Sequence, residues 1–133
     1  MQYACGLTQE VAAAGDLLDV YRGAVAEAFV GQESLACQDR FKKPELHYWA
    51  REQKNSNAEV DYIMQSGSEI VPIEVKSGTT GTLKSLHIFL SSANMSRGLK
   101  ISQGTYMPGK PVTALPLYAV GQWWELLSKD NGE

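Results

Sequence analysis

The sequence has few of the residues that build metal clusters or disulfide frameworks. Its 133 residues contain two cysteines, Cys5 and Cys37, and two histidines, His47 and His87. The cysteines belong to no Cys-x-x-Cys pair, so neither a zinc site of four Cys and His ligands nor a disulfide framework is expected. We interpret both cysteines as small apolar residues in a reducing cytosol and predict a cytoplasmic protein.

Long apolar runs and serine-hydrolase motifs are also missing. No stretch approaches the roughly 20 apolar residues that span a bilayer, and residues 1–15 lack the basic region of a signal peptide. A Gly-x-Ser-x-Gly elbow is absent, and two histidines leave little material for a Ser/His/Asp triad. The sequence therefore predicts no membrane partner and no serine hydrolase.

The formal net charge is −3, and this acidity argues against a strongly basic DNA coat protein. The charge is unevenly distributed, however. Residues 1–39 carry six acids and one base, and residues 111–133 carry three acids and one base. Residues 40–110 carry ten bases against six acids. A polyanionic partner such as DNA is therefore expected to contact the middle of the chain.

The length and the 44% of hydrophobic residues are typical of one globular domain. Helical spacing of apolar residues runs from Asp16, the expected N-cap, to about Gln38, and it returns over residues 83–93. Strands are predicted at 46–50, 58–64, 69–77, 99–103 and 114–120. The second and third strands are expected to form a β-hairpin, and residues 122–129 a short helix or an extended cap.

The resulting order α-β-β-β-α-β-β predicts a single α/β domain with a mixed α+β sheet. Its parts are expected to be an N-terminal lead-in over residues 1–15, a core over 16–120 and a C-terminal tail over 121–133.

The strand around Glu74 has an unusual polar face. Period-two geometry places Val71, Ile73 and Val75 on one face and Pro72, Glu74 and Lys76 on the other. Lys and Glu are disfavoured inside strands, so an acid and a lysine two positions apart form a candidate site.

The preceding strand is expected to place Glu59 and Asp61 on one face, opposite Val60 and Tyr62, and to bring Asp61 beside Glu74 in the hairpin. Converging carboxylates repel each other, and Mg²⁺ or Mn²⁺ would suit their oxygen atoms. A neighbouring lysine can orient the attacking water. The alternative is a cross-strand salt bridge on a solvated face, which contributes only about 0–1 kcal/mol.

The first helix offers a third acid, Glu27, beside its apolar stripe. The small residues Gly23, Gly31 and Ser34 surround it at i−4, i+4 and i+7, which lets another backbone or a ligand approach. The alternative is that the glycines only allow the helix to pack on the sheet and that Glu27 is solvated.

These residues together resemble the pattern of the PD-(D/E)XK nuclease superfamily, which reads here as Glu27, then Asp61, then Glu74-Val75-Lys76. More narrowly, the segments YRGAVAEAFVGQE, LHYWAREQKNSNAEVDYIM and IVPIEVKSGTTGTLKSLHIFL are similar to a family of unknown function at the C-terminus of prokaryotic AAA-type ATPases. The similarity runs from about Gly6 to Val120. An isolated Asp…Glu-x-Lys pattern is common by chance. The family match is specific because the helix acid Glu27 and the segments EVDYIM and IVPIEVKSG occur together in the expected order.

The resemblance implies a restriction-endonuclease-like core in the order α-β-β-β-α-β. It also implies that Asp61, Glu74 and the Val75 carbonyl are metal ligands, that Lys76 serves the nucleophilic water, and that Glu27 is an outer ligand. Two features depart from the pattern. Val60 stands where the motif has proline, and the ATPase domain is absent from this chain.

The expected function is a Mg²⁺- or Mn²⁺-dependent nuclease that hydrolyses DNA phosphodiester bonds. The alternative is a non-catalytic DNA- or protein-binding regulatory module with a degenerate nuclease fold. An ATPase is then an expected partner or parent.

Basic residues around the first strand are candidates for DNA contact, chiefly Arg51 and Lys54, with Arg40, Lys42 and Lys43 before them. The alternative is a solvated loop beside a strand with core aromatics, among which Trp49 is expected to be core.

The segment GTTGTLKS resembles a phosphate-binding loop, but Leu83 replaces the required glycine. We interpret it as a strand-to-helix turn with Thr82 as N-cap, from which Lys84 can reach a DNA phosphate.

Trp123 and Trp124 cannot both face inward on a regular element. One of them is a candidate contact with an ATPase or with a second copy of the chain, which predicts a homodimer. The simpler interpretation is a tail folded over a hydrophobic edge.

Overall fold

The helices and strands follow the order expected from the sequence, with a 3₁₀ helix before the expected short C-terminal helix. The computed structural model describes residues 17–54, 57–66, 68–78 and 82–129. Within them lie three α-helices, five strands and one 3₁₀ helix: α2 (Leu17–Ala36), β1 (His47–Arg51), β2 (Ala58–Ser66), β3 (Glu69–Val75), α3 (Lys84–Ser92), β4 (Gly98–Ser102), β5 (Val112–Pro116), η1 (Leu117–Gln122) and α4 (Trp123–Lys129). The expected N-cap, Asp16, and Cys5 lie outside the described residues.

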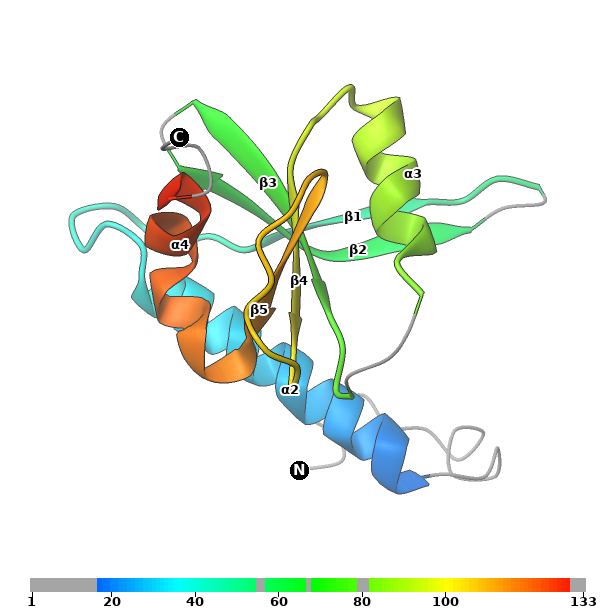
Figure 1. Cartoon of the computed structure of the whole chain (residues 1–133), viewed down its shortest axis with the longest axis horizontal. Helices are drawn as coiled ribbons and strands as arrows, with labels where there is room; N and C mark the ends of the chain where they lie inside the picture. Colours follow the sequence, from blue (N-terminus) through cyan, green and yellow to red (C-terminus); the bar gives the residue numbers. More distant parts are fainter. Residues whose placement is uncertain (1–16, 55–56, 67, 79–81, 130–133) are drawn as a thin grey trace.

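The strands form one mixed sheet in the order β1-β2-β3-β4-β5 (Figure 1). β1, β2 and β3 are antiparallel neighbours, and β2 and β3 pair as the expected hairpin, with Ser66 opposite Glu69. β4 runs parallel to β3 and β5 runs parallel to β4. A parallel pair needs a long crossover connection, and α3 supplies it between β3 and β4. The chain is therefore a small α+β domain.

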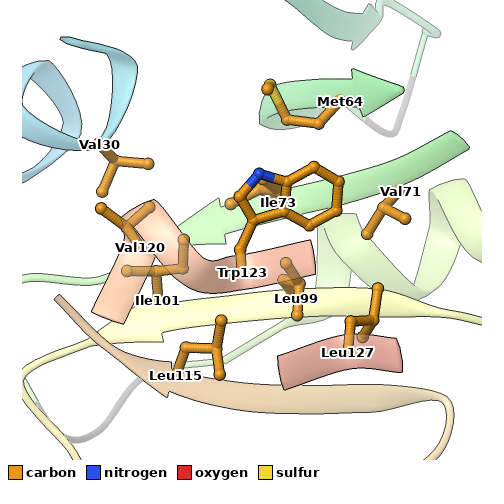
Figure 2. Close-up of a cluster of buried hydrophobic side chains, with 10 residues drawn as sticks. All are labelled: Val30, Met64, Val71, Ile73, Leu99, Ile101, Leu115, Val120, Trp123 and Leu127. Carbon is orange, nitrogen blue, oxygen red and sulfur yellow. The ribbon is translucent and has the colours of Figure 1, made fainter. Parts of the chain in front are cut away.

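Helices cover both faces of the sheet (Figure 1). On one face, α2, η1 and α4 cover a cluster of ten buried residues, among them Ile73 and Trp123 (Figure 2). On the other face, α3 places Leu86, Phe89 and Leu90 against Val60. Both faces of the central strands are thus withdrawn from water, which is the main favourable term in folding.

The faces of β3 are those predicted from its alternation. Val71 and Ile73 are fully buried in the cluster under α2, and Val75 packs against that cluster. Pro72 and Glu74 are also buried, on the opposite side of the strand.

The faces of β2 differ from the prediction because the strand is irregular. His47 pairs with Ile63 whereas Trp49 pairs with Val60, so β2 contains one residue more than β1 between these pairs. This bulge changes the alternation. Val60 consequently packs under α3, whereas Tyr62 packs under α2. The expectation that these two side chains share a face was wrong.

Three smaller expectations also need correction. The last predicted strand ends at Pro116, and residues 117–120 belong to η1. The N-cap of α3 is Leu83, which makes no side-chain capping bond, so Thr82 does not cap it. Cys37 is exposed, and its thiol donates a hydrogen bond to the Gly121 carbonyl.

The two tryptophans of α4 adopt the simpler of the two arrangements. Trp123 is buried and Trp124 packs partly buried against the same cluster, with their rings edge to face at 5.6 Å. The tail thus folds over the hydrophobic edge of the sheet. Trp49, expected in the core, is partly buried and packs edge to face on Phe89. Across the residues that the structure describes, none of the helices has the length and apolarity to cross a bilayer.

Candidate active site

Asp61 and Glu74 lie just beyond the last regular pair of the β2–β3 hairpin. The last regular pair is Tyr62 with Ile73, so the next position on each strand is Asp61 on β2 and Glu74 on β3. The Asp61 carboxylate accepts a hydrogen bond of 2.7 Å from the Val75 backbone N–H through Oδ2. Asp61 therefore lies beside the end of β3, as the hairpin register expected from the sequence requires.

Glu74 is the buried member of the acid–lysine pair. Its side chain is 10% exposed, and Oε1 lies 2.9 Å from the Lys76 ammonium, which is 29% exposed. The other oxygen, Oε2, is buried and has no hydrogen-bond partner among the described residues. A buried carboxylate oxygen without a donor is costly. Glu74 thus has one oxygen satisfied by Lys76 and one able to accept a ligand.

The backbone around the pair is fixed by the parallel part of the sheet. Glu74 pairs with Lys100, and the Lys76 N–H donates to the Ile101 carbonyl at 2.8 Å. Lys76 is therefore held by the sheet although it lies just beyond the last residue of β3. Its aliphatic stem can remain packed while its charged end reaches solvent.

Glu27 approaches from α2. The Tyr62 phenol donates a hydrogen bond of 2.9 Å to the Glu27 carbonyl. One helical turn later, a Cβ on Gly31 would lie only 2.6 Å from the same phenol oxygen. Glycine thus allows α2 to lie directly on Tyr62, which confirms the packing role expected for Gly31. Gly23 differs, since a Cβ there would meet nothing within 4 Å.

The three carboxyl groups disfavour each other's charge. Burial raises the pKa of Glu74, with repulsion from Asp61 and Glu59 added, while Lys76 acts in the opposite direction. Burial also raises the pKa of Asp61 despite the Val75 hydrogen bond and the Lys76 charge. The pKa of Glu27 is raised first by burial and then by repulsion from Asp61, Glu74 and Glu59. All three carboxyl groups are therefore harder to ionise than free carboxyl groups.

The possible metal ligands are few. In the part of the chain that the structure describes, no three Asp, Glu, His or Cys side chains form a ready-made cluster. The best candidate ligands are the carboxylates of Asp61 and Glu74. The backbone of Val75, between Glu74 and Lys76 in the sequence, can add to them. Mg²⁺ is commonly held by one or two carboxylates together with water and substrate phosphate, so a pair is chemically sufficient.

The predicted DNA-contacting residues divide into two regions. Arg51 and Lys84, far apart in the sequence, line one groove beside α3. Lys54 is exposed beyond the end of β1 and does not line that groove. Lys42 and Lys43 line a different cavity, and Arg40 lies over the Phe41 ring, 4.9 Å from its centroid.

That second cavity is the larger one, with a volume of about 640 Å³. It lies between the C-terminal end of α2, the loop after it and α4, and neither cavity is lined by Asp61, Glu74 or Lys76. Cavity size suits an enclosed small molecule, whereas a polymer substrate needs an open site. The chemistry of the carboxylate pair therefore locates the candidate site better than volume does.

Sequence reasoning missed two contributors to this region. Tyr62 was assigned only to an apolar face, although its phenol binds α2 beside Glu27. His87 was not assigned a role, yet it lies with Arg51 and Lys84 in the groove. A signal was present for Tyr62, because it directly follows the candidate ligand Asp61. For the groove, the i, i+3 spacing of Lys84 and His87 could have predicted that both side chains lie on one face of the helix.

Comparison with known proteins gives one match. The family model described as a domain of unknown function, DUF4143, matches residues 22–119, which include Glu27, Asp61, Glu74 and Lys76. No curated protein and no solved structure matches the chain.

Proposed function

The chain belongs to the DUF4143 family, and we propose that it is a metal-dependent nuclease domain with a restriction-endonuclease-like core that hydrolyses DNA phosphodiester bonds. One observation carries this function. Asp61, Glu74 and Lys76 converge where the antiparallel hairpin ends, and one buried oxygen of Glu74 has no partner in the described chain.

The topology supports the same function. The first six elements, α2, β1, β2, β3, α3 and β4, follow the order implied by the resemblance to PD-(D/E)XK nucleases. β3 carries Glu74 at its C-terminal end, Lys76 follows directly after the strand, and β2 supplies the first acid beside it. Both acids thus lie on strands buried in the middle of the domain, which hold a site more rigidly than loops do.

Asp61, Glu74 and the Val75 carbonyl would hold Mg²⁺ or Mn²⁺, with Glu27 on the outer side. The unpartnered Glu74 oxygen and the mutual repulsion of the three acids both fit a divalent cation. When bound, such an ion polarises the phosphoryl group and lowers the pKa of a coordinated water.

Lys76 would position the attacking water and stabilise negative charge on the phosphate. Its ammonium contacts Glu74 and remains partly exposed, so it can reach both the carboxylate and a substrate in solvent. Preorganised charge of this kind is a major source of catalysis.

A non-catalytic module is the second candidate. One observation favours it: the Lys76 ammonium already lies 2.9 Å from Glu74 Oε1, as in a purely structural ion pair. In that case Lys76 would only neutralise Glu74, and the fold would serve binding alone.

Incubation of the purified chain with circular and branched DNA separates the two candidates. We expect cleavage with Mg²⁺ or Mn²⁺ and none in EDTA. Glu74→Ala and Lys76→Ala should each lower the rate by at least about 100-fold, the usual contribution of a positioned proton-transfer group. Lys129→Ala on α4 is the matched charge control. Full activity in both site variants would show that a contaminant cleaves the DNA.

Ion binding measured by calorimetry completes the test. Lys76→Ala should retain Mn²⁺ binding because it leaves the carboxylates intact, whereas Asp61→Asn should lose it. A wild-type chain that binds Mn²⁺ and DNA but cleaves neither substrate would support the non-catalytic module.

A further inference from the structure

We propose that the open groove between α3 and the end of β1, here called the α3 groove, binds the sugar-phosphate backbone of DNA and leads the strand to the carboxylate site. Six residues line it: Arg51, Lys84, His87, Ile88, Ser91 and Ser92. The choice of DNA as the polymer rests on the proposed function, whereas backbone binding does not require catalysis.

The groove is formed by the outward side of α3. Its five α3 residues follow each other at i, i+3, i+4, i+7 and i+8, which is one continuous helical stripe. The opposite stripe of Leu86, Phe89 and Leu90 is buried against the sheet. The same nine-residue helix therefore presents an apolar face inward and a polar face outward.

The chemistry of the groove suits phosphate oxygen atoms. Arg51 and Lys84 supply positive charge, and His87 and the Ser91 hydroxyl add hydrogen-bond donors, whereas the Ser92 hydroxyl donates to the Phe89 carbonyl. None of the six lining residues is acidic, although the whole chain has a net charge of −3. The first turn of α3 also lacks an acid, so nothing there neutralises the positive end of the helix dipole.

The shape of the groove favours a polymer backbone over an enclosed ligand. A nine-residue helix is about 13 Å long, so the stripe can run alongside several atoms of an extended strand. The lining contains no Phe, Tyr or Trp on which bases could stack. Contacts should therefore be made to phosphates and be independent of sequence.

The groove is also connected to the candidate site through β2. Arg51 pairs with Ala58, which lies on the strand that carries Asp61. α3 packs on the same strand (Figure 1). Its Leu86, Phe89 and Leu90 side chains form one cluster with Val60. A backbone held in the α3 groove is thus placed along the strand that supplies the first acid.

Binding of labelled 20-nucleotide single-stranded and duplex DNA, measured in EDTA at several salt concentrations, tests the groove without catalysis. Lys84→Ala should reduce the slope of log K against log salt by about 1, corresponding to one lost phosphate contact. Affinity at about 0.1 M salt should fall at least about threefold. His87→Ala and Ser91→Ala should weaken binding further when combined with Lys84→Ala.

Lys110→Ala and Lys129→Ala are the controls, since both remove an exposed lysine outside the groove. Circular dichroism and unfolding curves should show that Lys84→Ala folds normally, because Lys84 is exposed at the first position of the helix. Equal slopes for Lys84→Ala and Lys110→Ala, or no DNA binding at any salt concentration, would overturn the α3 groove.

The two proposals fail differently. DNA binding measured in EDTA reports on the groove alone, because the proposed cleavage requires a divalent ion. Groove-dependent binding without cleavage would refute the nuclease and keep the groove. Metal-dependent cleavage that is unchanged in Lys84→Ala and His87→Ala would refute the groove and keep the nuclease.

Discussion

The Tyr62 phenol donates a hydrogen bond to the Glu27 carbonyl, joining residues that are 35 positions apart. Because Tyr62 follows Asp61 in β2 and Glu27 lies in α2, this bond fixes the helix beside the carboxylate pair. Gly31 makes the contact sterically possible, since a Cβ at that position would collide with the phenol oxygen.

We predict opposite effects from alanine at the two glycines of α2. Alanine is favoured over glycine in a helix interior by up to about 1 kcal/mol. Gly23→Ala should therefore raise the free energy of unfolding, because the site is open. Gly31→Ala should lower it, because its Cβ would lie 2.6 Å from Tyr62 Oη. Urea unfolding of both variants measures the difference, and a stabilising Gly31→Ala would contradict the close contact.

Removal of the phenol oxygen should relieve that collision. Tyr62→Phe alone is expected to cost about 1 kcal/mol, the usual value for a hydrogen bond. In the Tyr62→Phe background, Gly31→Ala should cost less than it does in the wild type, because the nearest remaining ring atom is 3.1 Å away. Tyr118→Phe is the control, since Tyr118 is 89% exposed. Strictly additive effects would show that Gly31 and Tyr62 are not coupled.

Glu27→Gln should stabilise the protein at neutral pH. Burial and the neighbouring acids raise the pKa of Glu27 above its ordinary value of 4.5, so the folded state holds this proton more tightly than the unfolded chain. The stability gained from that proton is present below about pH 4.5 and is lost as the pH rises through the folded-state pKa.

The difference between Glu27→Gln and wild type should therefore be near zero at pH 4 and grow toward pH 7. It should reach at most about 1 kcal/mol, because Glu27 is exposed and solvent screens its charge. Unfolding in urea at several pH values without divalent ions measures it, with Glu52→Gln as the control. A difference that shrinks as the pH rises would contradict the charge repulsion.

Divalent ions should stabilise the wild-type protein through Asp61 and Glu74. A ligand that binds only the folded state adds about 2.7 kcal/mol when its concentration is 100 times the Kd. We expect Mn²⁺ to raise the melting temperature of the wild type and of Glu125→Gln, but not of Asp61→Asn or Glu74→Gln. Equal stabilisation of all four proteins would place the ion elsewhere.

Lys76→Met should destabilise the fold more than the double variant Glu74→Gln with Lys76→Met. The single change leaves the buried Glu74 carboxylate without its 2.9 Å partner, which typically costs about 1–3 kcal/mol. Replacing both groups removes the unpaired charge together with the ion pair. Urea unfolding of the two single variants and the double variant gives the coupling energy. A double variant that is less stable than Lys76→Met would show that Glu74 does not depend on Lys76.

Much of the fold followed from the sequence because the signals are local. The alternation of Val71, Ile73 and Val75 fixes which face of β3 is apolar, and the acid and the lysine then share the other face. The register of the β2–β3 hairpin, from Ser66 with Glu69 to Tyr62 with Ile73, puts Asp61 and Glu74 at the next position of each strand. Each of these features depends on residues close to one another in the chain.

The tertiary structure decided what depends on contacts between distant segments. The bulge that separates the faces of Val60 and Tyr62 arises from pairing with β1, so the strand's own alternation could not reveal it. The α3 groove exists because α3 packs over the β1–β2 edge and brings Lys84 to Arg51. Local periodicity therefore indicated the candidate ligands. Long-range packing decided where α2 and α3 lie relative to the strands that carry these ligands.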